Sequence, residues 1–236
     1  MGGAHGVAAE EDDFSRAGGY AALAIGAAYV AIIALYALAG APPAGVEPML
    51  TYLGGRTITW WTILGLSVLT DMLFIPLGLS LYLALRAFDR NAMRIALAFI
   101  ALFVVLDLAV TWTNYAALLS LSADYGGAVS ETQRAIDVAA ATYASSVLSS
   151  HLSPVYAIGT LSFAILLTGI VMRKAAFGRV PAYLGIATGI LGIPALSGAG
   201  VAIVLNATAA TLWVFAVGYR LVRSPATAHA ENLSAN

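Results

Sequence analysis

The chain has 236 residues and a formal net charge of −1, and its composition excludes an ordinary water-soluble domain. Hydrophobic residues make up 61% of the chain and charged residues only 10%, whereas a soluble domain usually carries about 25% charged residues. The apolar residues fall in long runs, which favours membrane-spanning helices over a soluble core. No cysteine is present, so disulfides, thiolate metal sites and cysteine nucleophiles are excluded.

Polar tails flank the apolar region. Residues 1–17 are rich in acidic residues, and we expect them, like residues 223–236, to be a disordered cytoplasmic tail. The first apolar run covers residues 18–41, which exceeds the roughly 20 residues that a spanning helix needs. A cleaved signal peptide is the alternative, because residues 37–41 are mostly small. The acidic tail and the length of the run favour a retained helix.

Five further apolar runs follow the first and complete the predicted fold, an all-α polytopic transmembrane helix bundle with six spans in a single domain. Pro42 and Pro43 end the first span, and Trp60 and Trp61 form an interfacial aromatic belt near the start of the second. The five later spans are expected at residues 57–86, 92–121, 154–173, 181–198 and 201–222.

Residues 131–150 are expected to form an extra helix before the fourth span. Ser130 and Gln133 have the spacing of a capping box, which marks a helix start. The segment is weakly amphipathic and carries Arg134 and Asp137. One apolar stripe is formed by Ile136, Ala140, Tyr143 and Val147.

The distribution of basic residues predicts the orientation. With both termini in the cytoplasm, cytoplasmic segments hold nine of the eleven lysines and arginines, and outer segments hold only Arg56 and Arg134. Basic residues gather on the cytoplasmic side of membrane proteins. We therefore expect a multi-pass protein of the bacterial inner membrane, with residues 131–150 outside and with Arg134 and Asp137 exposed to water or headgroups. The rival is a seven-span layout with the C-terminus outside.

Two aspartates lie at membrane depth. Asp71 precedes Arg86 by 15 residues and Asp107 follows Arg94 by 13 residues, which places both roughly 20 Å from the cytoplasmic turn between their antiparallel helices. The two carboxyl groups are expected at similar depth, although the sequence does not determine which way they face. An ionised carboxylate is costly there, so a protonated acid that donates a hydrogen bond is expected.

Polar residues accompany each aspartate. Ser67 lies one turn before Asp71, and Pro76 after it is expected to kink the helix. On the next span, Thr111, Asn114 and Tyr115 are spaced to share a face with Asp107, and on the last span Asn206 and Thr208 are candidates for burial.

This collection has two interpretations. The functional one is a proton- or cation-binding pair, or a site for a small polar ligand, since carboxylates in spans usually mark sites. The structural one is a set of interhelical hydrogen bonds, each worth about 0.6 kcal/mol in a membrane. For the aspartates, the sequence weighs the two interpretations equally.

His151 is the only histidine outside the tails and lies among serines near the predicted outer interface. A Ser–His pair would suggest a membrane-embedded hydrolase, but no Gly-x-Ser-x-Gly elbow supports it, so we name no catalytic residue. We predict no metal, no cofactor and no nucleic-acid partner, because no metal-ligand cluster, P-loop or dinucleotide motif is present. Gly185, Gly189 and Gly192 are interpreted as a small-residue packing face.

Several segments resemble an uncharacterised bacterial family of six-helix membrane proteins that is catalogued as a domain of unknown function. The resemblance is carried by Leu69-Thr-Asp71-Met-Leu-Phe with Leu81-Tyr-Leu-Ala-Leu-Arg86, by the series His151, Gly159, Phe163 and Gly169, and by Phe177-Gly-Arg179-Val-Pro181-Ala-Tyr-Leu-Gly185. One detail departs, because Arg179 precedes Pro181 here, whereas a basic residue usually follows this proline in the family. The resemblance implies six helices over about residues 18–222 and implies no activity.

Three functions follow in order of preference. The first is transport linked to a proton or small ligand at Asp71 and Asp107, with a polar cavity between the second, third and sixth spans. The second is a non-catalytic sensor or partner subunit that binds another membrane protein through residues 131–150. The third is a hydrolase at His151. In each, the lipid bilayer is the surrounding partner.

Overall fold

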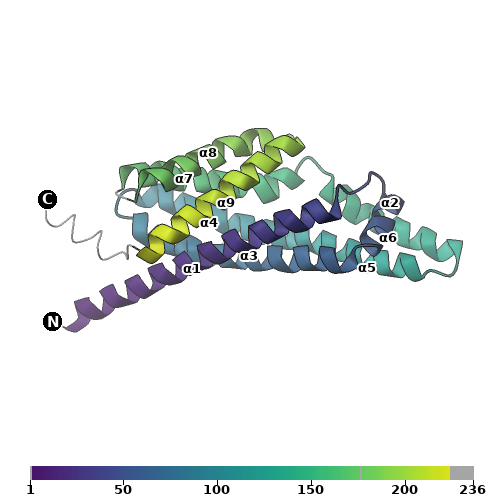
Figure 1. Cartoon of the computed structure of the whole chain (residues 1–236), viewed down its shortest axis with the longest axis horizontal. Coiled ribbons are helices and arrows are strands. Elements are labelled where there is room, and N and C mark those ends of the chain that lie inside the picture. The colour runs from purple at the N-terminus through teal and green to yellow at the C-terminus, as the bar shows by residue number, and fades with distance from the viewer. Residues whose placement is uncertain (1, 176, 224–236) are drawn as a thin grey trace.

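In a computed structural model, the chain is a bundle of long helices, with no strand in the part that the structure describes, residues 2–175 and 177–223 (Figure 1). Five stretches of this part are long and apolar enough to cross a membrane. They are Asp13–Ala39, Thr57–Leu85, Arg90–Gly127, Val155–Lys174 and Gly200–Arg223. The prediction of a helical membrane bundle is confirmed.

The predicted fifth span is not among these five stretches. It corresponds to α8 (Arg179–Ala195), which has 17 residues and is therefore roughly 25 Å long. That is less than the roughly 30 Å of a typical hydrocarbon core. By length and composition the described residues thus supply five spans where the sequence predicts six.

The N-terminal segment differs from the sequence prediction. Helix α1 (Gly2–Ala39) begins at the second residue, so the acidic stretch that we expected to be a disordered tail is helical. Helix formation is cooperative, and the long apolar helix that follows extends into this segment. The predicted C-terminal tail falls almost entirely on residues 224–236, outside the described residues.

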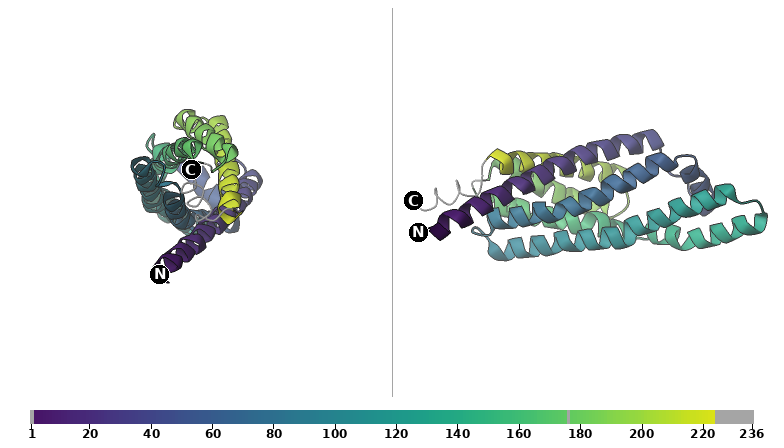
Figure 2. Two further views of the ribbon diagram at one scale, coloured as in Figure 1. Left: turned by 90° about the vertical axis from the view of Figure 1, so that its left-hand side faces the viewer. Right: turned by 90° about the horizontal axis from the view of Figure 1, so that it is seen from below.

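Six helical stretches form a closed ring. Helix α1 packs against α3 (Thr57–Leu85), which packs against α4 (Arg90–Leu106). The ring continues through α7 (Thr160–Lys174), α8 and α9 (Gly200–Arg223) and closes where α9 packs against α1. The end-on view in Figure 2 shows these helices around a common axis. Although α8 is short, it is a full member of the ring.

Two π-helical segments interrupt the long helices at the level where they face each other. Segment η1 (Asp107–Trp112) joins α4 to α5 (Thr113–Gly127), and η2 (Val155–Gly159) leads into α7. The two segments contact each other. By contrast, α3 runs through Pro76 without interruption. The π segments were not predicted, because i→i+5 hydrogen bonding has no simple sequence signature.

Beyond the ring, a second core forms at the end of the molecule that α5 reaches. Helix α2 (Val46–Gly54), which we did not predict, packs there against α5 and α6 (Glu131–Leu148) (Figure 1). Trp60 at the start of α3 is buried in this core. Trp60, which the sequence placed at the membrane interface, therefore connects α3 of the ring to the second core.

Helix α6 starts where the sequence predicts, and the face that it buries carries Asp137, Ala141 and Ala144. The Gln133 amide N–H donates to the Ser130 hydroxyl oxygen at 3.2 Å, as a cap requires, while the Gln133 side chain bonds Asp137 at 3.0 Å. Asp137 is buried, so the prediction that it is exposed is wrong. Two members of the apolar stripe, Ile136 and Tyr143, are exposed, whereas α6 packs through the small side chains of Ala141 and Ala144.

The turns and helix ends that carry most of the basic residues lie at the opposite end of the ring. Figure 1 places the α3–α4 turn, the α7–α8 turn, the N-terminal part of α1 and the C-terminal end of α9 there. Asp89 caps α4 through the Ala92 amide at 3.0 Å and pairs with Lys174 at 3.1 Å. Both contacts stabilise the carboxylate, the amide more strongly, and they hold the pKa of Asp89 below its usual range. We call this end the basic end.

Glycines bring α7, α8 and α9 into close contact. A methyl group built on Gly169 would lie 2.8 Å from the Ile186 backbone nitrogen, and one on Gly185 would lie 3.1 Å from the Gly169 Cα. Gly189 and Gly192 face Leu166 and Ser162 on α7. The prediction that the glycines of α8 form a packing face is confirmed.

We expect Gly169→Ala to lower the free energy of unfolding by about 1–3 kcal/mol, because the added methyl group meets backbone atoms that cannot rotate away. Unfolding in mixed micelles by increasing the fraction of denaturing detergent measures the change. Gly65→Ala is the matched control, because Gly65 lies on the exposed face of α3 with no atom near its missing Cβ. Equal stability of the two variants would contradict the close α7–α8 packing.

Candidate functional site

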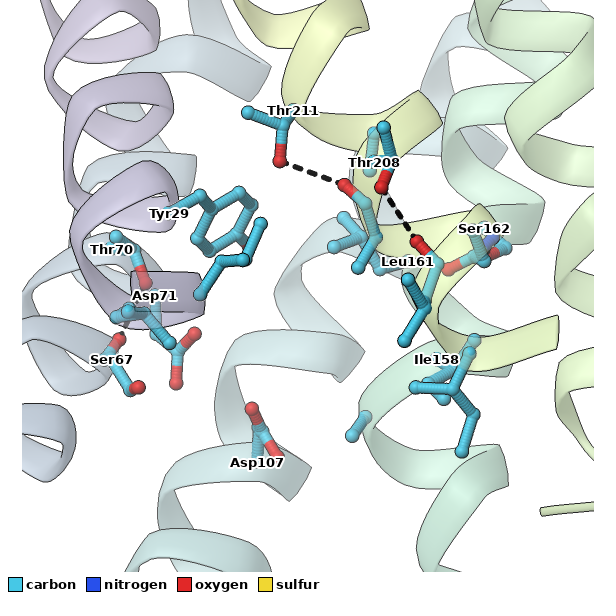
Figure 3. A pocket seen from close by; sticks show the side chains of 18 of the residues that line it. Tyr29, Ser67, Thr70, Asp71, Asp107, Ile158, Leu161, Ser162, Thr208 and Thr211 are labelled. Atoms are coloured by element: carbon cyan, nitrogen blue, oxygen red, sulfur yellow. Dashed lines mark hydrogen bonds between the residues drawn. The ribbon is translucent and has the colours of Figure 1, made fainter. Parts of the chain in front are cut away.

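A cavity of about 680 Å³ lies inside the ring. Its walls come from α1, α3, α4, η1, η2, α7 and α9, while α8 does not reach it. Most of the lining is apolar or aromatic, as in typical small-molecule sites. The polar exceptions include Ser67, Thr70 and Asp71 on one side and Ser162, Thr208 and Thr211 on the other (Figure 3). Asn206 also lines the cavity.

Asp71 and Asp107 share this cavity. Both line it, and their side chains are 2% and 4% exposed. The indole N–H of Trp112 lies between them, 3.0 Å from Asp71 Oδ2 and 3.1 Å from Asp107 Oδ2. A single neutral donor therefore serves two carboxyl groups that come from different helices.

The η1 segment explains how Trp112 reaches Asp107. In an α-helix, residues five apart point in clearly different directions, whereas the wider turn of a π-helix, with its i→i+5 hydrogen bonds, brings them closer to one face. Two side chains satisfy carbonyls near the interruption: Thr113 donates to the Leu108 oxygen at 2.8 Å and Asn114 donates to the Val110 oxygen at 2.7 Å. π segments of this kind are frequent at functional sites.

The carboxyl pair has no fixed positive partner in the cavity. Among the described residues that line it there is no lysine, arginine or histidine. Among the described residues, the second oxygen of Asp107, Oδ1, is buried and makes no well-formed hydrogen bond, although the buried hydroxyl of the neighbouring Thr111 interacts with this carboxyl group. A buried acceptor left unsatisfied costs about 1–3 kcal/mol, and more when it is charged. The site is therefore ready to accept a proton or another donor.

Aromatic side chains surround the pair and continue toward the second core. Tyr29, Tyr36 and Phe103 line the cavity together with Trp112. The Trp112 ring packs on Tyr115 with a centroid distance of 5.7 Å, and Tyr115 stacks on Trp60 at 5.4 Å. This chain of rings fixes the indole that holds the two carboxyl groups, which makes its position depend on both cores.

The polar residues of α9 have different surroundings. Asn206 is buried and donates to the Ser162 hydroxyl at 3.1 Å and to the Thr188 carbonyl at 2.9 Å, so it joins α9 to α7 and α8. Thr208, which we expected to be buried, is exposed at the edge of the cavity and donates to the Val204 carbonyl at 2.8 Å. Figure 3 shows Thr208 and Thr211 beside the apolar wall formed with Leu161 and Ile158.

The remaining candidates lie away from the cavity lining. Thr111 is buried near Asp107, and Tyr115 packs against the Trp112 ring. Asn114 donates to a carbonyl of its own helix. These residues do not share one face with Asp107, because the π segment shifts the helical register that we assumed. His151 is exposed beyond the end of α6. The structure records no hydrogen bond between His151 and a serine among the described residues; Ser149 donates to the Ser145 carbonyl at 2.8 Å.

Sequence reasoning missed several residues of the site, among them Trp112 and Tyr29. Trp112 follows Asp107 by five residues, which in an unbroken helix gives no reason to join them. Tyr29 comes from α1, whose sequence offers only one apolar run. A tryptophan well inside a span, away from the usual interfacial belt, was the one available signal for Trp112.

The comparisons with known proteins return nothing: no protein-family model, no curated protein and no solved structure matches this chain. The resemblance to a six-helix family thus stays a prediction. The structure itself supports the class of a helical membrane bundle with a cavity inside its ring.

We expect Trp112→Phe to lower the free energy of unfolding by about 1–3 kcal/mol more than Trp213→Phe, because only the first change leaves two buried carboxyl groups without a donor. Trp213 is the matched control, since it is buried and its indole N–H has no partner among the described residues. Trp112 is the less buried of the two, so loss of packing alone predicts the opposite order. Unfolding in mixed micelles distinguishes the two outcomes.

Proposed function

We propose that Asp71 and Asp107 form an intramembrane site for a proton or a cation and that the protein has a transport role coupled to this site. The observation that carries the proposal is the shared indole N–H of Trp112, which holds both carboxyl groups at the wall of one cavity. The second oxygen of Asp107 makes no well-formed hydrogen bond among the described residues, so it has capacity for a further donor.

The physical argument is the cost of charge. Two ionised carboxylates close together in an apolar environment repel each other and are both desolvated. The Trp112 N–H is neutral and compensates only part of that cost. Binding one proton or one cation between the carboxyl groups removes the repulsion, so occupancy of the site is coupled to the charge that the cavity carries.

We also propose six spans with both termini in the cytoplasm of a bacterial cell. Nine of the eleven lysines and arginines belong to segments at the basic end, as expected of the cytoplasmic side. Helix α8 lies along both α7 and α9, and 17 residues are at the lower limit of a spanning helix, so local thinning of the bilayer suffices for it to cross. In this orientation the carboxyl pair lies roughly 20 Å from the cytoplasmic side.

The test of the site follows Trp112 fluorescence in purified protein in lipid nanodiscs as the pH is varied. We expect a titration in the wild type that disappears in Trp112→Phe and in the double variant Asp71→Asn/Asp107→Asn. In proteoliposomes with an entrapped pH indicator, the same double variant is expected to reduce proton uptake driven by a membrane potential about tenfold or more.

Asp137→Asn is the matched control, because Asp137 is also buried, with one oxygen that has no partner among the described residues, but lies on α6, away from the cavity. It is expected to retain both signals. A fluorescence titration that persists without Asp71 and Asp107 would contradict the proton or cation site. A titration without any proton uptake would contradict a role in proton transport.

Orientation is tested with single cysteines, which the cysteine-free chain makes unambiguous. In intact cells, an impermeant maleimide is expected to label Val129→Cys between α5 and α6, and not Val180→Cys at the start of α8 or a cysteine appended to the C-terminus. Val129 and Val180 are 100% and 65% exposed, so both thiols are reachable once the label has access. Labelling of Val180→Cys from outside would reverse the orientation, and labelling at the C-terminus alone would mean that α8 does not cross.

A further inference from the structure

The contact between α1 and α9 is closed at one end and open at the other. Near the basic end, Gly19 packs against Val222, and a methyl group built on Gly218 would lie 2.9 Å from the Gly19 carbonyl oxygen. Gly26 is covered by the Phe215 ring. From there the two helices separate toward the start of α9 (Figure 1).

The cavity reaches the surface where these helices separate. Ile33 and Tyr36 of α1 and Val204 and Thr208 of α9 all line it. All four are also exposed, Ile33 by 46% and Val204 by 63%. Residues that are both lining and exposed mark a mouth, so the cavity opens sideways between α1 and α9.

This mouth lies within the membrane. Ile33 follows Arg16 by 17 residues and Val204 precedes Arg220 by 16 residues, which places both roughly 25 Å along the helices from the basic end. A hydrocarbon core is about 30 Å thick. The opening therefore faces lipid acyl chains in the half of the bilayer away from the basic end.

The interior combines two chemical features. Apolar side chains such as Leu161 and Ile165 form one wall, and the carboxyl pair with Trp112 forms the other. The aromatic rings of Tyr29 and Tyr36 also border the cavity, and such rings attract cations over their faces. A ligand that satisfies both features carries a positive group at one end and a hydrocarbon body at the other.

We infer that the cavity binds an amphiphilic organic amine, which enters from the lipid through the gap between α1 and α9 and places its ammonium group between Asp71 and Asp107. This inference rests on the proposed function of the pair as a cation site. The ammonium group donates to Oδ1 of Asp107 and supplies the positive charge that the described lining residues do not provide. Its hydrocarbon body fills a cavity whose volume of about 680 Å³ is typical of sites for small organic ligands.

The binding test uses dansylcadaverine, a fluorescent primary amine, and dansyl pentylamide, which has the same body without the amine. Energy transfer from protein tryptophans to the dansyl group in lipid nanodiscs reports binding. We expect the amine to bind about tenfold or more tightly than the neutral compound, and Asp71→Asn/Asp107→Asn to abolish this difference while Asp137→Asn preserves it.

The entry route is tested with a matched pair of variants on α9. Val204→Trp places a large ring at the mouth, whereas Leu205→Trp adds the same ring to the next residue, which is 51% exposed and does not line the cavity. Both add one tryptophan, so their signals are compared with each other. We expect Val204→Trp to slow association and dissociation of dansylcadaverine about tenfold relative to Leu205→Trp, with a similar equilibrium affinity.

The outcomes separate this inference from the proposed function. Equal binding of the two dansyl compounds, or binding that does not depend on the aspartates, overturns the amine site even when the pH titration of Trp112 fluorescence is intact. Equal rates in Val204→Trp and Leu205→Trp overturn the lateral entry route. Loss of the Trp112 titration itself overturns the proton or cation site, and the amine site with it.

Discussion

One indole N–H holds two carboxyl groups that would otherwise repel each other in an apolar cavity. Asp71 comes from α3 and Asp107 from η1, and Trp112 reaches both. Buried carboxyl groups in a membrane are costly, so this arrangement persists only because the surrounding helices hold the three side chains in place. The ring of helices, the π segment and the aromatic packing all contribute to that constraint.

The two halves of the ring have different mechanical roles. On the α7–α8 side, Gly169 and Gly185 bring the backbones together, and Asn206 joins α9 to both neighbours through two hydrogen bonds. This side of the ring is tightly packed. On the side of η1 and η2, helical geometry is interrupted and the cavity replaces close packing.

The second core connects the cavity to the far end of the molecule. Trp60 is buried there, stacks on Tyr115 and thereby supports Trp112. Tyr125 of α5 donates to Glu47 of α2 at 2.6 Å and closes the outer edge of the same core. A continuous series of stacked rings thus joins this core to the indole between the two carboxyl groups.

The sequence by itself determined the class of the protein, the approximate position of each long apolar helix, the start of α6 at Ser130 and the similar depth of Asp71 and Asp107, although it missed α2 and the helical N-terminal part of α1. These follow from hydropathy, capping and the constant rise of a helix, which are properties of the local chain. Only the tertiary structure decided that the two aspartates face one cavity, that Trp112 joins them and that Asp137 is buried. The reason is that rise gives the position of a residue along a helix axis, whereas its direction around the axis depends on packing and, at η1, on a change of helical register that no local pattern encodes.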